Sequence, residues 1–247
     1  MFSGIGGIDL GLDRAGWSCA GQVEIDPFCR KVLAKHWPDV PRHDDVRTAI
    51  EWWGSERRPR VRAVVGGYPC QPESMAGKRM GVGDPRWLWP EMARVIHALR
   101  PRWVIGENVD GHVSKGLRFV LRDLERLGYH SVPGTIRACE VGAPHPRQRV
   151  LTLAHSYGRR SMLGVRGELV MGNRDTNRKG DSNRWPDPDD WVEASFGDSR
   201  VADGVPRGMD RYRNTALGNA VVPAIAERAG RIINAIEEAR KEGKKAG

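Results

Sequence analysis

The thiol of Cys70 and the carboxyl group of Glu107 are the side chains of this sequence best suited to covalent catalysis. Cys70 lies in the segment GGYPCQP (66–72), which follows the β-branched run RAVV (62–65), and Glu107 follows a second apolar run, WVIG (103–106). Such runs are typical of buried parallel strands, and open α/β sheets carry their chemistry at the carboxyl ends of these strands. We therefore expect a nucleophile and a proton donor side by side at one sheet edge.

A glycine-rich turn and a spaced acidic residue indicate a nucleotide-type cofactor on the same sheet. The segment FSGIGG (2–7) precedes an amphipathic stretch that ends near Gly16, and a second strand candidate ends in VEID (23–26). Glycines let the main chain approach a ligand at a helix amino terminus. An acid roughly 20 residues further on, here Glu24, commonly binds ribose hydroxyls.

Strand and helix candidates alternate through the first 156 residues. This alternation with short connections predicts a doubly wound parallel sheet with right-handed crossovers. The regular pattern stops at about residue 157 and returns in a terminal helix with a charged tail. The expected helix faces are Met92, Val95, Ile96 and Leu99, then Leu117, Val120, Leu121, Leu124 and Leu127 before Gly128, and finally Ile225, Ala229, Ile232, Ile233 and Ile236.

The composition favours a polyanionic partner. Lys and Arg total 40 against 31 Asp and Glu, which gives a formal net charge of +9 and a pI near 9.8. Contacts between basic side chains and phosphates supply most non-specific affinity for DNA. No apolar run approaches the ~20 residues of a membrane span and no signal sequence opens the chain, so we expect a cytoplasmic protein without membrane contact.

The chain length of 247 residues suits one large α/β domain, alone or with a small insertion. Its four cysteines show no zinc-type spacing, and its seven histidines are scattered, so we predict no metal. Cys19, Cys29 and Cys139 are expected to be small buried residues in a reducing compartment.

Six short motifs occur in an order that resembles the DNA (cytosine-5)-methyltransferases. They are FSGIGG, VEID, GGYPCQP, ENV, PHPRQR and LGNAVVP. The resemblance implies a Rossmann-like, doubly wound, mostly parallel sheet of the S-adenosylmethionine-dependent methyltransferase type, with a small irregular target-recognition insertion. It places a catalytic and cofactor-binding α/β domain at 1–156, a short recognition region at 157–210, and a return segment with a C-terminal helix at 211–247.

This resemblance implies that Cys70 attacks C6 of cytosine, so that C5 becomes nucleophilic and accepts a methyl group. Glu107 would hydrogen-bond or protonate N3 of the base, and Asn108 would fix the loop. The alternating side chains of Arg147 and Arg149 would share one face of an extended segment and contact the catalytic carboxylate and cytosine O2. Either arginine could instead bind phosphate or be an ordinary surface residue.

The cofactor implied by the resemblance is S-adenosylmethionine. Three of its contacts have open alternatives. Asp44 competes with Asp45 for the adenine, and Leu88 serves equally as an apolar wall or as a core residue at a helix start. Glu24 could instead be an exposed acidic residue at a strand end without a role in binding. The implied cofactor-binding residues are Phe2, Gly4, Gly6, Glu24, Asp45, Leu88 and Asn219.

The implied substrate is double-stranded DNA, from which the target cytosine must be flipped out before C6 can be reached. Residues 71–86 contain three glycines and several basic residues, and we expect a loop that closes over the DNA or an ordinary flexible loop. The resemblance also allows a cognate restriction endonuclease as partner, and we expect the protein to be a monomer.

Three features depart from the family pattern. Only Met1 precedes Phe2, where relatives carry an apolar first strand in the centre of the sheet. Glu73 stands where relatives have an apolar residue, and an acid near a thiolate raises its pKa. The recognition region at 157–210 is short and lacks a clear organising motif. The alternative function is therefore a truncated, inactive relative that binds DNA or cofactor without turnover.

Two other enzyme classes fit the sequence poorly. An amino-methyltransferase needs an Asp- or Asn-led Pro-Pro-aromatic motif, which YPCQ (68–71) is not. A nicotinamide-dependent oxidoreductase would leave the PCQ, ENV and RQR segments without a role. A related enzyme that acts on RNA cytosine is not separated from a DNA enzyme by the basic charge.

Overall fold

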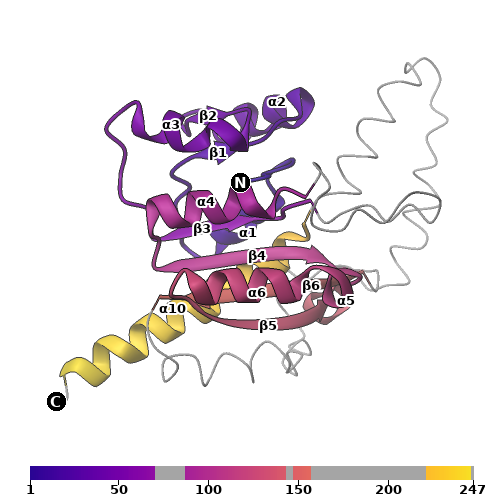
Figure 1. The fold of residues 1–247 in the computed structure, drawn as a ribbon, viewed down its shortest axis with the longest axis vertical. Coiled ribbons are helices and arrows are strands. Elements are labelled where there is room, and N and C mark those ends of the chain that lie inside the picture. The colour runs from indigo at the N-terminus through magenta and orange to yellow at the C-terminus, as the bar shows by residue number, and fades with distance from the viewer. Residues whose placement is uncertain (70–86, 143–146, 157–220, 246–247) are drawn as a thin grey trace, which may run out of the picture.

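A mixed four-stranded sheet forms the centre of the computed structural model. In the order β3-β4-β6-β5, β3 and β4 are parallel, whereas β6 runs antiparallel to both β4 and β5 (Figure 1). The expected α/β class is confirmed, and the reversed β6 is the departure from an all-parallel arrangement. The strands span Ala63–Gly66 (β3), Trp103–Val109 (β4), His130–Arg137 (β5) and Gln148–His155 (β6). The structure describes residues 1–69, 87–142, 147–156 and 221–245.

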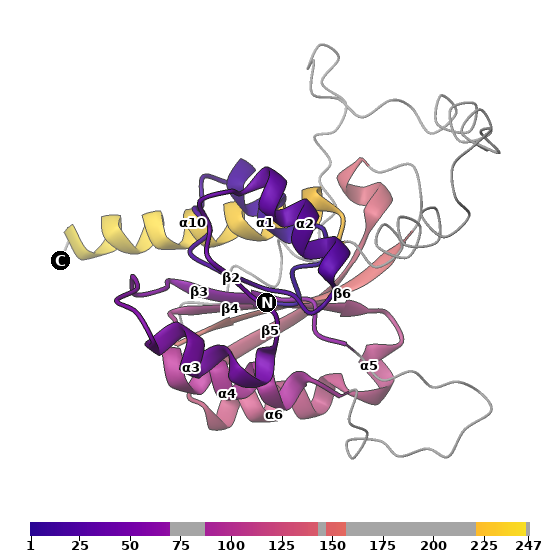
Figure 2. The same ribbon diagram turned by 90° about the horizontal axis from the view of Figure 1, so that it is seen from above.

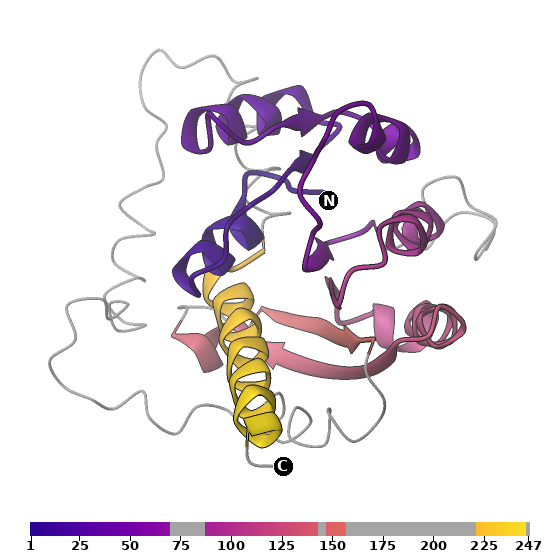
Figure 3. The same cartoon turned by 90° about the vertical axis from the view of Figure 1, so that its left-hand side faces the viewer.

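The first three residues join this sheet to a small parallel pair, β1 (Gln22–Val23) and β2 (Arg42–His43). The Ser3 amide donates to the Val23 carbonyl at 3.2 Å, and the Met1 amine donates to the Val65 carbonyl at 2.6 Å. The amino terminus therefore lies between β1 and β3 (Figures 1 and 3). In relatives, we expect a central strand of several apolar residues at this place. In this chain, Met1, Phe2 and Ser3 lie there.

Helices cover both faces of the sheet (Figure 2). Helices α1 (Gly7–Arg14) and α10 (Pro223–Lys245) cover one face, and α4 (Trp89–Leu99) and α6 (Leu117–Arg126) cover the other. The shorter helices are α2 (Pro27–His36), α3 (Ala49–Gly54) and α5 (His112–Lys115), with 3₁₀ turns η1 (Val46–Thr48) and η3 (Ala138–Val141).

Helices α1 and α10 pack closely because glycines face the contact. A Cβ atom on Gly7 would lie 2.1 Å from the Val221 carbonyl oxygen, and one on Gly11 would lie 2.1 Å from the Pro223 carbonyl oxygen. Any larger residue at either position would force the helices apart. The chain thus returns from the carboxyl end to a place directly beside the glycine-rich turn.

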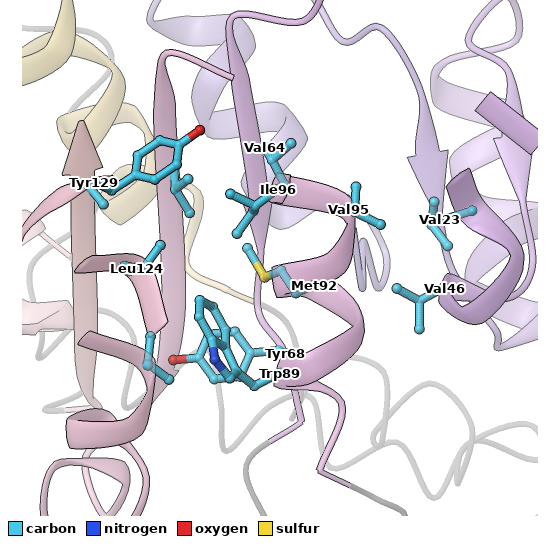
Figure 4. Close-up of a cluster of buried hydrophobic side chains, with 14 of the residues drawn as sticks. Val23, Val46, Val64, Tyr68, Trp89, Met92, Val95, Ile96, Leu124 and Tyr129 are labelled. Carbon is cyan, nitrogen blue, oxygen red and sulfur yellow. The ribbon is translucent and has the colours of Figure 1, made fainter. Parts of the chain in front are cut away.

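The core is divided between the two faces of the sheet. Alternate residues of β4 point to opposite sides: Val104 packs in the cluster under α4 and α6, whereas Trp103 and Ile105 pack under α10. Figure 4 shows the first cluster around Met92. The predicted helix faces are confirmed by the burial of Met92, Val95, Ile96, Leu117, Val120, Leu124, Ile225, Ala229, Ile232 and Ile233.

Some expectations about single elements were wrong. Cys139 is exposed, because it lies in the η3 turn beyond β5, and Cys19 is only half-buried. Glu107 and Asn108, in contrast, lie near the carboxyl end of β4, where the sequence placed them. In the part of the chain that the structure describes, no helix is long and apolar enough to cross a membrane.

Candidate active site

A cavity of about 520 Å³ lies at the carboxyl ends of β1, β3 and β4. Its volume is in the range of about 300–1,000 Å³ that is usual for cofactor and ligand sites. Most of the predicted site residues meet in its wall. They are Phe2, Gly4, Glu24, Asp45, Leu88, Glu107, Arg147 and Arg149.

Glu107 is a buried carboxyl group held by a cation from the neighbouring strand. The Arg149 Nε atom lies 2.8 Å from the Glu107 Oε1 atom, and the two side chains are 13% and 10% exposed. Burial raises the pKa of Glu107, while the positive charges of Arg149 and Arg147 oppose that rise. A carboxyl group with a raised pKa retains its proton to higher pH and can therefore donate it to a bound base.

The reversed strand β6 explains how the two arginines reach Glu107. Arg149 pairs with Val109 in the antiparallel register, which places it diagonally across from Glu107. Arg147 and Arg149 both line the cavity, while the intervening Gln148 donates from Nε2 to the Asp110 carboxylate at 3.0 Å. The expectation that both arginines share one face is confirmed.

Asn108 fixes the chain just before Cys70. Its Nδ2 atom donates to the Tyr68 carbonyl oxygen at 2.9 Å, and its Oδ1 atom accepts from the Val109 amide at 2.9 Å. Gly67 permits this close approach, because a Cβ atom there would lie 3.0 Å from Glu107 Oε2. The end of β3 is thus held against the residues that follow Gly106 in β4.

Glu24 organises the opposite side of the cavity. Its Oε2 atom accepts from the Gly4 amide at 2.7 Å, and its Oε1 atom accepts from the Asp26 amide at 2.9 Å. Gly4 has φ of 53°, a left-handed conformation in which glycine is favoured. Since each carboxylate oxygen has two lone pairs, both oxygens of Glu24 retain acceptor capacity for ligand hydroxyls.

Gly6 is not among the residues that line the cavity, and local structure explains why a glycine is required at this position. It precedes the first turn of α1 with φ of 90°, and a Cβ atom would lie 2.4 Å from the Trp37 ring. The absence of a side chain at Gly6 lets the Trp37 ring pack against the start of α1. The cofactor role that the sequence indicated for Gly6 stays a prediction.

Asp44 and Asp45 both line the cavity, but they have different local contacts. The Asp45 carboxylate accepts from the Arg47 amide at 2.8 Å and so caps the η1 turn. Asp44 has a side chain that is 64% exposed and lies 3.8 Å from the His43 Nδ1 atom. Leu88 both lines the cavity and packs against the core, so its two expected roles are compatible.

Several predicted residues lie outside the described part of the chain. Their neighbours are described, however: Pro69 lines the cavity, and Val221 lies next to both Gly7 and Gly67. The segments that precede Cys70 and follow Asn219 therefore end at this site. The undescribed expectations are Cys70, Glu73, the loop 71–86, the recognition region 157–210 and Asn219.

Sequence reasoning missed several residues around Glu107 and the end of β3. A Cβ atom on Gly67 would lie beside both Glu107 and Val221, and Tyr68, which lines the cavity, forms a buried pair with His112. The two adjacent glycines before Tyr68 were a usable signal, since a side chain on either would meet a neighbour at about 3 Å. A single histidine such as His112 gave no pattern in the sequence.

Comparison with solved structures shows the same fold. The Dnmt2 methyltransferase of S. pombe matches with a TM-score of 0.54 at 19% identity, covering 72% of this chain and 57% of that one. The methyltransferase EhMeth of Entamoeba histolytica matches with a TM-score of 0.52 at 19% identity, covering 64% of this chain and 52% of the other. At this identity the likeness concerns the fold alone.

Curated sequences and a family model extend the comparison. The type II methyltransferase M.AquIA of Picosynechococcus sp. is 32% identical, over 64% of this chain and 71% of the relative. M2.BsuMI of Bacillus subtilis is 34% identical, over 64% of this chain but only 41% of the relative, so the match spans less than half of that protein. The model of the C-5 cytosine-specific DNA methylases matches residues 1–200, and the chain belongs to this family.

Proposed function

We propose that this protein transfers a methyl group from S-adenosylmethionine to carbon 5 of a flipped-out cytosine in double-stranded DNA, through a covalent bond between Cys70 and C6. The observation that carries the proposal is the buried Glu107 carboxyl group, which is paired with Arg149 in the same cavity as Glu24. Membership of the C-5 cytosine-specific family and the type II methyltransferases among its relatives support it.

The first step requires Cys70 as a thiolate. Its sulfur forms a bond to C6, the C5–C6 double-bond electrons move toward C5, and the negative charge spreads over the ring to N3 and O2. Glu107 would stabilise this charge by donating its proton to N3, which its raised pKa favours. After methylation, a water molecule would take the C5 proton, the sulfur–C6 bond would break, and the N3 proton would return to Glu107, which restores the aromatic ring and the thiolate.

The arginines complement this proton transfer. Arg149 would hold the Glu107 carboxyl group in one orientation through the 2.8 Å contact, both before and after the proton leaves. Arg147 lines the same cavity, and its positive charge lowers the Glu107 pKa, so the carboxylate is stabilised once the proton has left. We propose that one of the two also donates to cytosine O2.

The cavity fits the proposed cofactor. Phe2 and Leu88 offer apolar surface, Gly4 brings main chain to the wall, and the Glu24 carboxylate offers acceptors for ribose hydroxyls. Asp44 or Asp45 would contact the adenine, and Asn219 would close the site from the carboxyl end. When bound, S-adenosylmethionine supplies the electrophilic methyl group that C5 of the activated ring takes.

DNA as the substrate is supported by the formal charge of +9. We expect binding to weaken steeply as salt concentration rises, because Lys and Arg contacts release counterions from the phosphates. A modification role beside a cognate restriction endonuclease, with the protein acting as a monomer, completes the proposal.

The experiment is methyl transfer from labelled S-adenosylmethionine to mixed-sequence DNA, followed by nucleoside analysis, with Cys70→Ser as the matched variant. Label in 5-methylcytosine that the variant abolishes would support both the reaction and the nucleophile. Label in another base would overturn the mechanism. Cofactor binding without any transfer would instead identify an inactive relative.

A further inference from the structure

Tyr68, Trp87 and His112 form a buried aromatic cluster at the cavity, whose wall includes Tyr68, and the mechanism above gives this cluster no task. The Tyr68 hydroxyl and the His112 Nε2 atom lie 3.0 Å apart, and the two residues are 2% and 0% exposed. The His112 ring also packs against both aromatic neighbours, with centroid distances of 5.4 Å to Tyr68 and 5.8 Å to Trp87. One histidine thus contacts both aromatic side chains.

The cluster lies at both ends of the segment that contains Cys70. Tyr68 is two residues before Cys70 in the sequence, and Trp87 directly follows residue 86. The Tyr68 and Trp87 rings meet edge to face at a centroid distance of 6.3 Å. Tyr68 and Trp87, which flank the segment 70–86 in the sequence, therefore pack against each other, with His112 against both.

The surroundings leave little freedom for these rings. A Cβ atom on Gly116 would lie 2.4 Å from His112 Cε1 and 2.8 Å from the Trp87 ring, and one on Gly106 would lie 3.3 Å from Tyr68 Cε1. Trp89 packs against Tyr68 from the other side at 5.0 Å between centroids (Figure 4). Burial lowers the pKa of His112 to about 4, so its ring is neutral at neutral pH and can share a hydrogen bond with a hydroxyl.

Tyr68 is held at two points by the stretch that carries Glu107. Asn108 holds its main-chain carbonyl group at 2.9 Å, and His112 holds its hydroxyl group at 3.0 Å. Asn108 adjoins Glu107 in β4, and His112 begins α5 just beyond that strand. Tyr68, which precedes Cys70 by two residues, is therefore fixed relative to the stretch of chain that carries the proposed proton donor.

We propose that the Tyr68 hydroxyl and His112 are a positioning pair that sets the location of the Cys70 thiol relative to Glu107. The inference rests on the proposed function. The two side chains meet each other and the neighbouring rings, and they act on the thiol through the short peptide between Tyr68 and Cys70. Misplacement of a reacting group by about 1 Å can cost roughly a hundredfold in rate, so a fixed Tyr68 has a direct catalytic value.

The test removes one oxygen atom from each of two buried tyrosines. Tyr68→Phe deletes the hydroxyl that meets His112, and Tyr129→Phe deletes a buried hydroxyl that donates to the Pro101 carbonyl at 2.6 Å, away from the site. We expect both variants to lose thermal stability, but only Tyr68→Phe to lose kcat, by about tenfold or more. The KM for DNA and the Kd for S-adenosylmethionine should stay unchanged in both.

Substitution of His112 gives the second half of the test. His112→Leu should lower kcat as Tyr68→Phe does, and the double variant should be no slower than the slower single one. His112→Gln places an amide group near the position of Nε2 and should recover part of the lost rate. Equal kcat in all of these variants and in the unchanged protein, with only their melting temperatures lowered, would overturn the positioning role.

Alkylation of Cys70 by iodoacetamide keeps the inference testable even if no methyl transfer occurs. Burial raises the pKa of Cys19 and of Cys29 to about 12, so both stay unreactive, and Cys139→Ser removes the exposed thiol. In that background Tyr68→Phe should change the Cys70 alkylation rate or its pH profile at least about threefold, whereas Tyr129→Phe should not. Unchanged alkylation would refute the inference, and absent methylation alone would refute only the proposed function.

Discussion

Among the residues that the structure describes, two cavities of similar size flank residues 1–3, and their walls differ in chemistry. The active-site cavity measures about 520 Å³ and includes Glu24, Glu107 and Arg149. The second cavity, which we call the amino-terminal slot, measures about 570 Å³ and lies between β1 and β3 among residues such as Trp52 and Val95. Volume alone would select the slot, so the arrangement of charged groups at strand ends is the better guide to function.

The acidic side chain of Asp9 in the slot also differs from the acids of the active-site cavity. Asp9 lines the slot, but its carboxylate already accepts from the Cys19 thiol at 3.2 Å and from Gln22 Nε2 at 3.0 Å. In the active-site cavity, acids and arginines face a common space near the chain leading to Cys70. We therefore expect changes in the active-site cavity to alter catalysis and ligand binding, and changes in the slot to alter stability.

The largest effect is expected from Glu107→Gln. The amide keeps the shape and a partner for Arg149 but cannot deliver a proton, and general acid catalysis typically contributes about 100- to 10,000-fold. Single-turnover methyl transfer should fall by that factor, while the Kd for S-adenosylmethionine, measured by calorimetry, stays unchanged. A variant as fast as the parent would remove Glu107 from the mechanism.

A smaller effect is expected from Glu24→Gln on cofactor affinity. Hydrogen bonds to a charged group contribute about 1.5–3 kcal/mol, which corresponds to a roughly ten- to hundredfold weaker Kd for S-adenosylmethionine. The matched change in the slot, Asp9→Asn, should leave this Kd unaltered. Equal cofactor affinity in both variants would contradict the proposal that the cofactor binds in the active-site cavity and not in the slot.

The pH–rate profile of methyl transfer should follow the protonation of Glu107, and substitution of Arg149 should shift this profile. The protonated carboxyl group is the active form, so the rate should fall as pH rises through its raised pKa, by up to about tenfold per pH unit. The Arg149 charge lowers that pKa, so Arg149→Met should move the falling limb to higher pH. Rate profiles of the two proteins at saturating cofactor and DNA test this; a shift to lower pH would contradict it.

The smallest effect is expected in the slot, at the amine of a chain that begins with Met1. Burial lowers the pKa of this amine below its usual value of 8.0, so the folded state binds fewer protons than the unfolded state. The free energy of unfolding should therefore rise with pH in the interval below 8 and then level off. Denaturant titrations of free and amino-terminally acetylated protein should show that acetylation removes this slope without changing methyl transfer.

Periodic and local signals in the sequence predicted much of this molecule. The apolar spacing in 92–99 and 117–127 predicted α4 and α6, and the runs at 62–65 and 103–106 predicted β3 and β4. These signals succeed because each element buries its own regular set of side chains. The glycine-rich turn and Glu24 were predicted to face one cofactor, and Gly4 and Glu24 line the same cavity, where the Gly4 amide donates to the Glu24 carboxylate at 2.7 Å.

Contacts between distant segments could not be predicted in this way. The reversal of β6 decides that Arg149 lies diagonally across from Glu107, but an alternating pattern of strands and helices carries no sign of strand direction. The packing of the Trp37 ring beside Gly6 is a second such contact, because the two residues belong to different elements. Tyr68 and His112 were missed since their pairing exists only in the folded molecule.

The close packing of α10 on α1 affects which parts of the sequence can change in length over evolution. Ile225, Ala229 and Ile233 complete the core under β4 and β6, so the final helix is as much part of this domain as the strands are. Strand β6 and helix α10 therefore share one core although they are far apart in the sequence. Because loop-closure entropy rises only slowly with length, the amount of sequence between them can change over evolution at little cost to this core.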